Sequence, residues 1–330
     1  MTLRRTLLPA TAALALSLSG CGALTSDDAS GSSGSDSSDT VVAGLYPLQY
    51  VAQRVAGDAF EVENLTQPGG EPHDLELGIG QTAALSDAAL LVYVDSLQPA
   101  VDEAADEVSG TEVLDAATVV DLAPFEDEHS EEEVAEEEHG EDEHSEDEGE
   151  DDHSGHDHGE LDPHFWHDPL RMADLGDAVA ERLAEIDPDE AESFEERAAE
   201  LRSDLEALDE EYSTGLSGCE VRTVVTNHDA FGYLEGYDLE LASINGISPD
   251  AEPTPAALAE LQDLIEETGI TTVFSETLVS PQAAEVLASD AGVDTAVLDT
   301  IEGLSDDTAD EDYLSLMRSN LATLQEANRC

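Results

Sequence analysis

The apolar residues of this chain form short strand-like and helix-like segments that alternate in two stretches. In the first stretch, strand patterns at residues 40–46, 60–65 and 89–94 alternate with helical spacing at residues 48–57, 79–88 and 97–108. Further strand-like pieces lie at Val113 and at residues 119–122. Strands that alternate with helices predict an α/β domain with a mostly parallel sheet.

The same alternation returns in the second half of the chain. Strand patterns lie at residues 221–226, 239–244, 271–275 and 295–298, and helical patterns start at 231 and cover 254–268, 281–291 and 312–325. Between the two stretches, residues 169–216 carry apolar residues at helical spacing with a break at Pro188. We therefore predict two small α/β lobes, residues 40–168 and 217–330, joined by a long, nearly continuous helix that acts as a rigid strut.

The N-terminus has the features of an export signal. Arg4 and Arg5 precede an apolar stretch at residues 7–18, which is shorter than the roughly 20 residues that a membrane-spanning helix needs. The sequence Leu-Ser-Gly-Cys that ends at Cys21 resembles a bacterial lipobox. We predict a lipoprotein signal at residues 1–20, a lipid anchor on Cys21 and a flexible tether at residues 21–39, with an ordinary signal peptide as the alternative. The folded part is then expected on the outer face of the cytoplasmic membrane.

The charge of the chain is strongly negative. Its 80 Asp and Glu residues face only 10 basic residues, all of them arginine, which gives a formal net charge of −70. Nucleic acid is excluded as an expected partner, because binding to phosphates needs basic patches. Such acidity suits a high-salt habitat or simply keeps the protein soluble, and the sequence does not decide between these.

Residues 125–160 break all periodicity and consist mainly of Glu, Asp and His. We predict an inserted, disordered loop without a core. Its six histidines can collect Zn²⁺ weakly; the alternative is a solvated acidic loop with no required role. These histidines are His129, His139, His144, His153, His156 and His158.

Three other histidines lie at the ends of predicted elements. His73 follows a strand and a Gly-rich turn, His164 precedes the long helix, and His228 directly follows a strand. Each alone is more often a structural residue, but together they can converge at the sheet edge where α/β proteins bind ligands. Three imidazoles and a carboxylate are a typical Zn²⁺ ligand set, and Asp299 at the end of a strand can supply the carboxylate.

Four motifs occur here in order: Pro-Gly-Gly-Glu-Pro-His-Asp, Asp-Pro-His-Phe-Trp, Asn-His-Asp-Ala-Phe-Gly-Tyr and Val-Phe-Ser-Glu. From about Val41 to Leu324 the chain thereby resembles the metal-specific solute-binding receptors of bacterial ABC importers, of the ZnuA type. The resemblance implies two α/β lobes joined by a backbone helix, with the metal site between the lobes. It places the metal ligands at His73, His164, His228 and Asp299. Histidine at the third position and a His-rich loop imply zinc rather than manganese.

Several site residues have alternative interpretations. Glu276, in the Val-Phe-Ser-Glu motif, is expected to orient a ligand imidazole, with a purely structural role as the alternative. The fourth ligand can be Asp299, Glu276 or water. His167 stands where the family usually has an aliphatic residue, and we expect it at the surface or behind the ligands rather than as an extra ligand.

Cys219 and Cys330 remain after Cys21 is assigned to lipid. In an oxidising compartment they are expected to form a disulfide that ties the last helix to the start of the second lobe. Zinc ligation by this pair is less favoured, since neither has another ligand at a suitable spacing.

The resemblance therefore implies a receptor that captures Zn²⁺ and delivers it to the membrane permease of an ABC importer, and we expect a monomer. A hydrolase is disfavoured, because the chain has no His-Glu-x-x-His motif and no serine or cysteine nucleophile motif. A receptor for manganese or another divalent metal, or a surface adhesin or zinc buffer, are the alternatives. Cu²⁺ and Ni²⁺ also suit three imidazoles, so geometry and availability decide among these metals.

Overall fold

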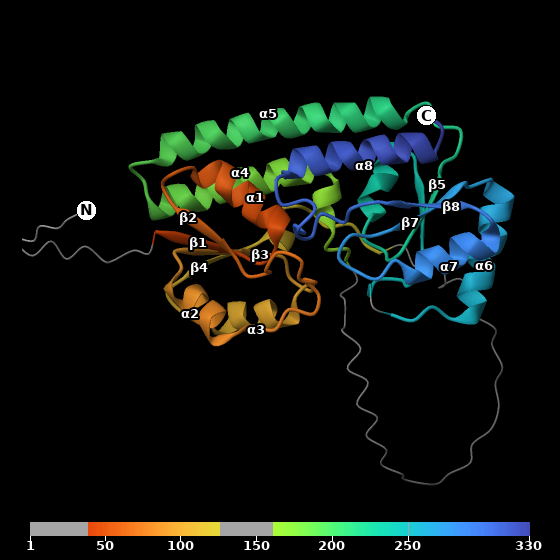
Figure 1. Cartoon of the computed structure of the whole chain (residues 1–330). Helices are drawn as coiled ribbons and strands as arrows, with labels where there is room; N and C mark the ends of the chain where they lie inside the picture. Colours follow the sequence, from red (N-terminus) through yellow and green to blue (C-terminus); the bar gives the residue numbers. More distant parts are fainter. Residues whose placement is uncertain (1–38, 126–160, 250) are drawn as a thin grey trace, which may run out of the picture. The chain divides into compact units, whose positions relative to one another are not determined.

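The computed structural model describes residues 39–125, 161–249 and 251–330, which contain two four-stranded parallel sheets (Figure 1). The first sheet has the strand order β2-β1-β3-β4 and forms the N-terminal lobe with helices α1, α2 and α3. The strands are β1 (Thr40–Ala43), β2 (Glu61–Asn64), β3 (Leu90–Tyr93) and β4 (Glu112–Asp115). The helices are α1 (Tyr46–Ala56), α2 (Ile79–Asp87) and α3 (Pro99–Glu107).

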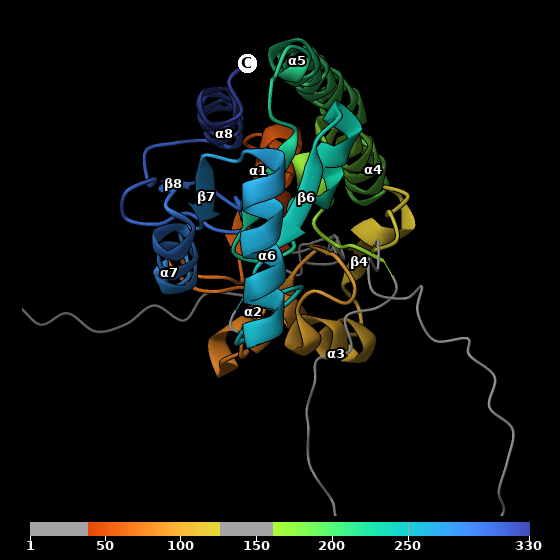
Figure 2. The same cartoon turned by 90° about the vertical axis from the view of Figure 1, so that its right-hand side faces the viewer.

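The second sheet repeats this order as β6-β5-β7-β8 and forms the C-terminal lobe (Figure 2). The strands are β5 (Thr223–Thr226), β6 (Glu240–Ser243), β7 (Thr272–Ser275) and β8 (Asp294–Val297). Its helices are α6 (Pro255–Thr268), α7 (Gln282–Ala291) and α8 (Tyr313–Ala327), with a 3-10 helix η3 (Gly232–Tyr237) after β5. The two sheets confirm the predicted pair of α/β lobes.

Both faces of each sheet are covered, which explains why the central strands are continuously apolar. Val42 of β1 packs in one cluster with Leu85 of α2 and Val101 of α3, whereas the preceding Val41 packs on the opposite face with α1. Neighbouring side chains point to opposite sides of a strand, so each strand contributes to two clusters. The C-terminal lobe is built in the same way, with a separate cluster under α6 and α7.

The predicted continuous helix is wrong: residues 169–216 form two helices that pack against each other. After the 3-10 helix η2 (Phe165–His167), α4 spans Pro169–Ile186 and α5 spans Ala191–Leu216 (Figure 1). The chain reverses at residues 187–190, because Pro188 cannot continue the hydrogen-bond ladder of α4. The 26 residues of α5 alone give about 39 Å of helix, which runs along both lobes (Figure 1).

One apolar core continues through both lobes along α5 and α8. It contains Val41 of β1 and Val224 of β5 together with Leu205 of α5 and Met317 of α8. The buried hydroxyl of Tyr212 on α5 also donates a hydrogen bond to the carbonyl of Met317, at 2.6 Å. The two lobes therefore share a core, which favours a fixed arrangement over a loose hinge.

Two shorter predictions also differ from the structure. Residues 119–122 form no strand; Val119 ends the short 3-10 helix η1 (Ala116–Thr118), and Asp121 has a φ of 53°. A strand cannot continue through that left-handed conformation. The segment predicted to start a helix at Phe231 is the 3-10 helix η3.

Several predictions concern residues outside those that the structure describes. They are the signal at residues 1–20, the anchor on Cys21, the tether up to residue 38 and the six histidines between residues 126 and 160. Within the described ranges, no helix combines the length and the apolar character needed to cross a membrane.

Cys219 and Cys330 form a disulfide in the structure. It joins the turn after α5 to the end of the chain beyond α8 and closes a segment with a sequence separation of 111 residues. A cross-link of this span restricts the unfolded chain strongly.

We predict that the double variant Cys219→Ser/Cys330→Ser lowers the free energy of unfolding by about 2–5 kcal/mol, because the unfolded chain regains the entropy of the closed segment. Urea denaturation of the zinc-free protein measures this loss. Reductant should destabilise the natural protein by a similar amount and leave the double variant unchanged. Equal stability of the two proteins would contradict the prediction.

Candidate metal centre

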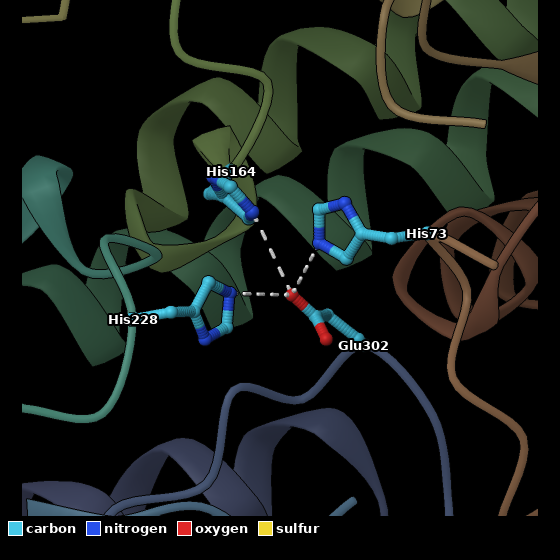
Figure 3. Close-up of side chains that lie close together, drawn as sticks. All are labelled: His73, His164, His228 and Glu302. Carbon is cyan, nitrogen blue, oxygen red and sulfur yellow. Dashed lines mark ion pairs between the residues drawn. The ribbon is translucent and has the colours of Figure 1, made fainter. Parts of the chain in front are cut away.

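Four buried side chains from separate segments converge on one point between the lobes (Figure 3). His73 lies in the loop after β2, His164 immediately precedes η2, His228 follows β5 and Glu302 lies in the loop after β8. Their donor atoms all lie within 4.8 Å of one another. The carboxyl ends of both parallel sheets thus supply ligand-type side chains, as open α/β sheets generally do.

The carboxylate oxygen Oε1 of Glu302 faces the Nε2 atoms of all three imidazoles (Figure 3). It lies 3.5 Å from that of His73, 3.6 Å from that of His164 and 3.5 Å from that of His228. A tetrahedral Zn²⁺ with bonds of about 2.0–2.1 Å places its donors about 3.3 Å apart. The spacing of Glu302 from the three imidazoles is therefore close to that of a zinc coordination sphere.

Two carboxylates hold two of the imidazoles from behind. Asp162 accepts from the backbone N–H of His164 at 2.9 Å, and its oxygen lies 2.7 Å from Nδ1 of the same residue. Glu276 accepts from the backbone N–H of His228 at 2.8 Å and lies 2.6 Å from its Nδ1. Such pairs place the proton on Nδ1 and leave the Nε2 lone pair facing the centre. The predicted orienting contact of Glu276 is present in this geometry.

Glu71 makes a related contact in the His73 loop. Its Oε1 accepts from the backbone N–H of His73 at 3.2 Å. Burial and the nearby Glu302 raise the pKa of Glu71 to about 7. A third carboxylate thus lies beside a ligand-type histidine.

The carboxylates and imidazoles of the cluster shift one another's pKa values. Burial alone disfavours the charged form of His228, but the carboxylates of Glu276 and Glu302 raise its pKa to about 10. Burial likewise opposes ionisation of Glu302, yet the imidazoles of His228 and His73 hold the pKa of Glu302 well below its ordinary value. A cation that entered the cluster would take over the role of the proton on His228.

The structure does not bring Asp299 into this cluster, and Glu302 occupies the place predicted for it. Oδ1 of Asp299 instead accepts from the backbone N–H of Ile301 at 2.8 Å. Glu302 was missed because no strand or motif marks it; it follows Ile301, whose φ of 59° turns the chain after β8. Sequence periodicity does not reveal a single left-handed residue.

The family described as ZnuA, zinc-uptake complex component A periplasmic, matches residues 41–327. The chain belongs to this family. The match confirms the resemblance that the four motifs indicated, and it covers both lobes and all four residues of the cluster. All four residues of the cluster in this ZnuA-family chain therefore lie within the matched residues 41–327.

Known proteins extend the comparison. The zinc-binding lipoprotein AdcA of Streptococcus pneumoniae is 33% identical over 290 residues, which cover 87% of this chain but only 55% of that relative. The solved Zn(II)-bound ZnuA-like domain of the same protein has a TM-score of 0.69 and 31% identity, covering 88% of this chain and 99% of that domain. This ZnuA-family chain thus spans about half the length of AdcA and nearly all of its ZnuA-like domain.

A second solved structure is the laminin-binding protein Lmb of Streptococcus agalactiae, described as a bifunctional protein with adhesin and metal transporting activity. It has a TM-score of 0.71 and 27% identity, with 87% of this chain and 98% of that chain covered.

His167 is buried, with 1% of its surface exposed, so of the two expected positions, at the surface or behind the ligands, the surface position is wrong. Its ring packs 4.6 Å from that of Phe231, centroid to centroid, and 6.2 Å from that of Trp166. Burial, together with the nearby His164, lowers the pKa of His167 to about 3. His167 lies outside the four-residue cluster and packs behind it as a neutral ring.

We predict that the ring C–H resonances of His167 in the zinc-free protein do not shift between pH 7.5 and 5, because the imidazole stays neutral. NMR measures this, and the spectrum of His167→Gln identifies the signal. The pKa of 6.5 expected for a histidine in the unfolded chain lies above the pKa of His167 in the folded protein. The free energy of unfolding therefore falls as the pH drops below about 6.5, by roughly 1.4 kcal/mol per pH unit. The variant should lack this contribution, and a midpoint near 6.5 for His167 would contradict the assignment.

Proposed function

We propose that this protein captures one Zn²⁺ between its lobes, with His73, His164, His228 and Glu302 as ligands. The observation that carries the proposal is the spacing of 3.5–3.6 Å between Glu302 and the three imidazoles. Nε2 of His164, Nε2 of His228 and Oε1 of Glu302 are also buried without a hydrogen-bond partner in the described structure. Buried polar atoms need a partner, and a metal ion shared by all of them provides one.

Zinc fits this donor set better than manganese does. Three neutral imidazoles and one carboxylate are borderline ligands that suit Zn²⁺, whereas Mn²⁺ prefers a larger share of oxygen ligands. The Zn(II)-bound relative supports the same choice. A manganese receptor remains the alternative that direct competition between the two metals tests.

The site suits capture rather than catalysis. Catalytic zinc sites keep one position open for water or substrate, while four protein donors close a tetrahedron. The family is one of zinc-uptake components, which accords with a receptor rather than an enzyme. We infer that the protein catalyses no reaction.

We infer that the captured ion passes to the permease of an ABC importer at the membrane. The family description names a component of a zinc-uptake complex, and AdcA is named a lipoprotein. The lipobox-like sequence at Cys21 supports a lipid anchor that holds the protein at the outer face of the cytoplasmic membrane. We propose a monomer with lobes at residues 40–168 and 217–330, and no nucleic-acid partner.

An adhesin role is the second candidate. The similarity to Lmb favours it, since that protein combines adhesin and metal transporting activity. The strongly acidic surface expected from a net charge of −70 restricts such a partner to one that tolerates or complements negative charge.

His228→Ala should weaken Zn²⁺ binding by at least about 100-fold, because loss of a direct ligand exceeds the 10- to 100-fold cost of losing its outer partner. Glu302→Gln should also weaken binding, since the amide removes the negative charge. Titration against a chelator of known zinc affinity measures both, with Mn²⁺ as competitor.

Glu311→Gln is the matched control for Glu302→Gln, because Glu311 is an exposed carboxylate just before α8. It should bind Zn²⁺ like the natural protein. Unchanged affinity in His228→Ala would remove that residue from the site, and tighter binding of Mn²⁺ than of Zn²⁺ would favour the manganese receptor.

The histidine-rich run covers residues 126–160. The residues that flank it lie side by side: Pro124 and Leu161 form an antiparallel bridge, and the N–H of Asp162 donates to the carbonyl of Ala123 at 2.8 Å. A short Gly-Ser link can therefore replace residues 126–160 without moving the described elements.

We predict that this deletion keeps one tight Zn²⁺ site and removes additional weaker binding. Isothermal titration calorimetry distinguishes the two, because weak sites appear as a separate late phase. The natural protein serves as the control and should show both phases. Loss of the tight site in a folded deletion variant would contradict the assignment of the cluster.

A further inference from the structure

We propose that Asp299, together with Asn320, is a positioning residue that places the Glu302 carboxylate in the metal cluster. The inference rests on the proposed function, because Glu302 is taken as a zinc ligand there. Asp299 is 8% exposed and Asn320 is 3% exposed, so both act from inside the C-terminal lobe.

The loop after β8 contains an unfavourable backbone conformation next to Glu302. Ile301 has a φ of 59° and is fully buried. A β-branched residue rarely adopts this left-handed conformation, because its side chain crowds the backbone. The surrounding structure must therefore hold Ile301 in place, and such held residues concentrate at functional sites.

The Asp299 carboxylate provides one such restraint. Its Oδ1 accepts from the backbone N–H of Ile301 at 2.8 Å. This bond closes a turn between the Asp299 side chain and the backbone two residues later. Glu302 follows directly, so the direction in which its side chain leaves the chain depends on this turn. Without the bond, Ile301 can relax towards negative φ, which would swing Glu302 away from the imidazoles.

Asn320 on α8 fixes Asp299 in turn. Its side-chain oxygen accepts from the Asp299 N–H at 2.9 Å, and its side-chain amide donates to the Asp299 carbonyl at 2.7 Å. The oxygen and the nitrogen of one buried side-chain amide thus hold the backbone N–H and the backbone carbonyl of the same residue, Asp299. The loop is also tied by the indole of Trp166, which donates to the Thr300 carbonyl at 2.8 Å.

Asp299 also connects two of the four proposed ligands. The side chain of Thr277 favours the charged form of the Asp299 carboxylate, and Thr277 directly follows Glu276, which holds His228. Each proposed ligand therefore has a nearby carboxylate that accepts from a backbone N–H in its own segment. These carboxylates are Glu71, Asp162, Glu276 and Asp299.

The test compares Asp299→Ala with Asp299→Asn. The amide keeps an oxygen that can accept from Ile301, so Asp299→Asn should bind Zn²⁺ within about threefold of the natural protein. Asp299→Ala loses the acceptor and should bind about 10- to 100-fold more weakly, the range for losing an outer partner of a metal ligand. The visible spectrum of bound Co²⁺ should change in Asp299→Ala and be retained in Asp299→Asn.

A second pair of variants tests the backbone directly and does not depend on Asp299→Ala alone. Ile301→Gly and Ile301→Ala both remove the buried side chain, but only glycine adopts positive φ without strain. In the Asp299→Ala background, Ile301→Gly should therefore recover zinc affinity that Ile301→Ala does not. Circular dichroism and thermal melting verify that each variant is folded.

The outcomes separate this inference from the proposed function. Loss of more than about tenfold in zinc affinity in Asp299→Asn would show that the charge matters, as for a direct ligand, and would overturn the positioning role. Equal affinity of the glycine and alanine variants would overturn it as well. If the natural protein binds no Zn²⁺ tightly, the proposed function fails and this inference fails with it.

Discussion

The structure depends on the burial of one carboxylate among three imidazoles. Glu302 is 1% exposed, and an ionised carboxylate in such a place is unfavourable unless positive charge compensates it. The three Nε2 atoms around Oε1 can supply that charge only by holding a proton or by sharing a metal ion. The rest of the fold holds the four side chains, two from each lobe, close enough for their donor atoms to share one ion.

The shared core supplies that frame. A single cluster of apolar side chains runs from β1 of the N-terminal lobe through α5 and α8 to β5 of the C-terminal lobe. The loops at the site are joined across the lobes as well, since the Gly69 N–H donates to the Leu304 carbonyl at 2.7 Å and the Tyr46 N–H donates to the Glu302 carbonyl at 3.3 Å. These contacts favour a fixed arrangement of the two lobes around the cluster.

Sequence reasoning located those parts of the fold and the site that local patterns encode. The strands are apolar runs bounded by turn residues, and His73, His164 and His228 lie within recognisable motifs at element ends. The helical hairpin was missed because α4 and α5 have the same periodicity, and Pro188 marks a break without giving the direction in which the chain continues. Glu302 was missed for a similar reason: its direction depends on the left-handed Ile301, which is held by Asp299 and, through Asp299, by Asn320 on a distant helix.

The buried carboxylates behind the imidazoles also bear on how the site discriminates between ions. A Zn²⁺ bound by three neutral imidazoles and Glu302 has a net charge of about +1, which Asp162 and Glu276 beside His164 and His228 can more than offset. A monovalent ion would leave this buried region with one more uncompensated negative charge than Zn²⁺ does. In the proposed site, charge therefore favours a divalent over a monovalent ion, and the imidazoles favour zinc over metals that prefer oxygen. The abundant surface acidity cannot provide such selection, because exposed carboxylates are solvated and screened by salt.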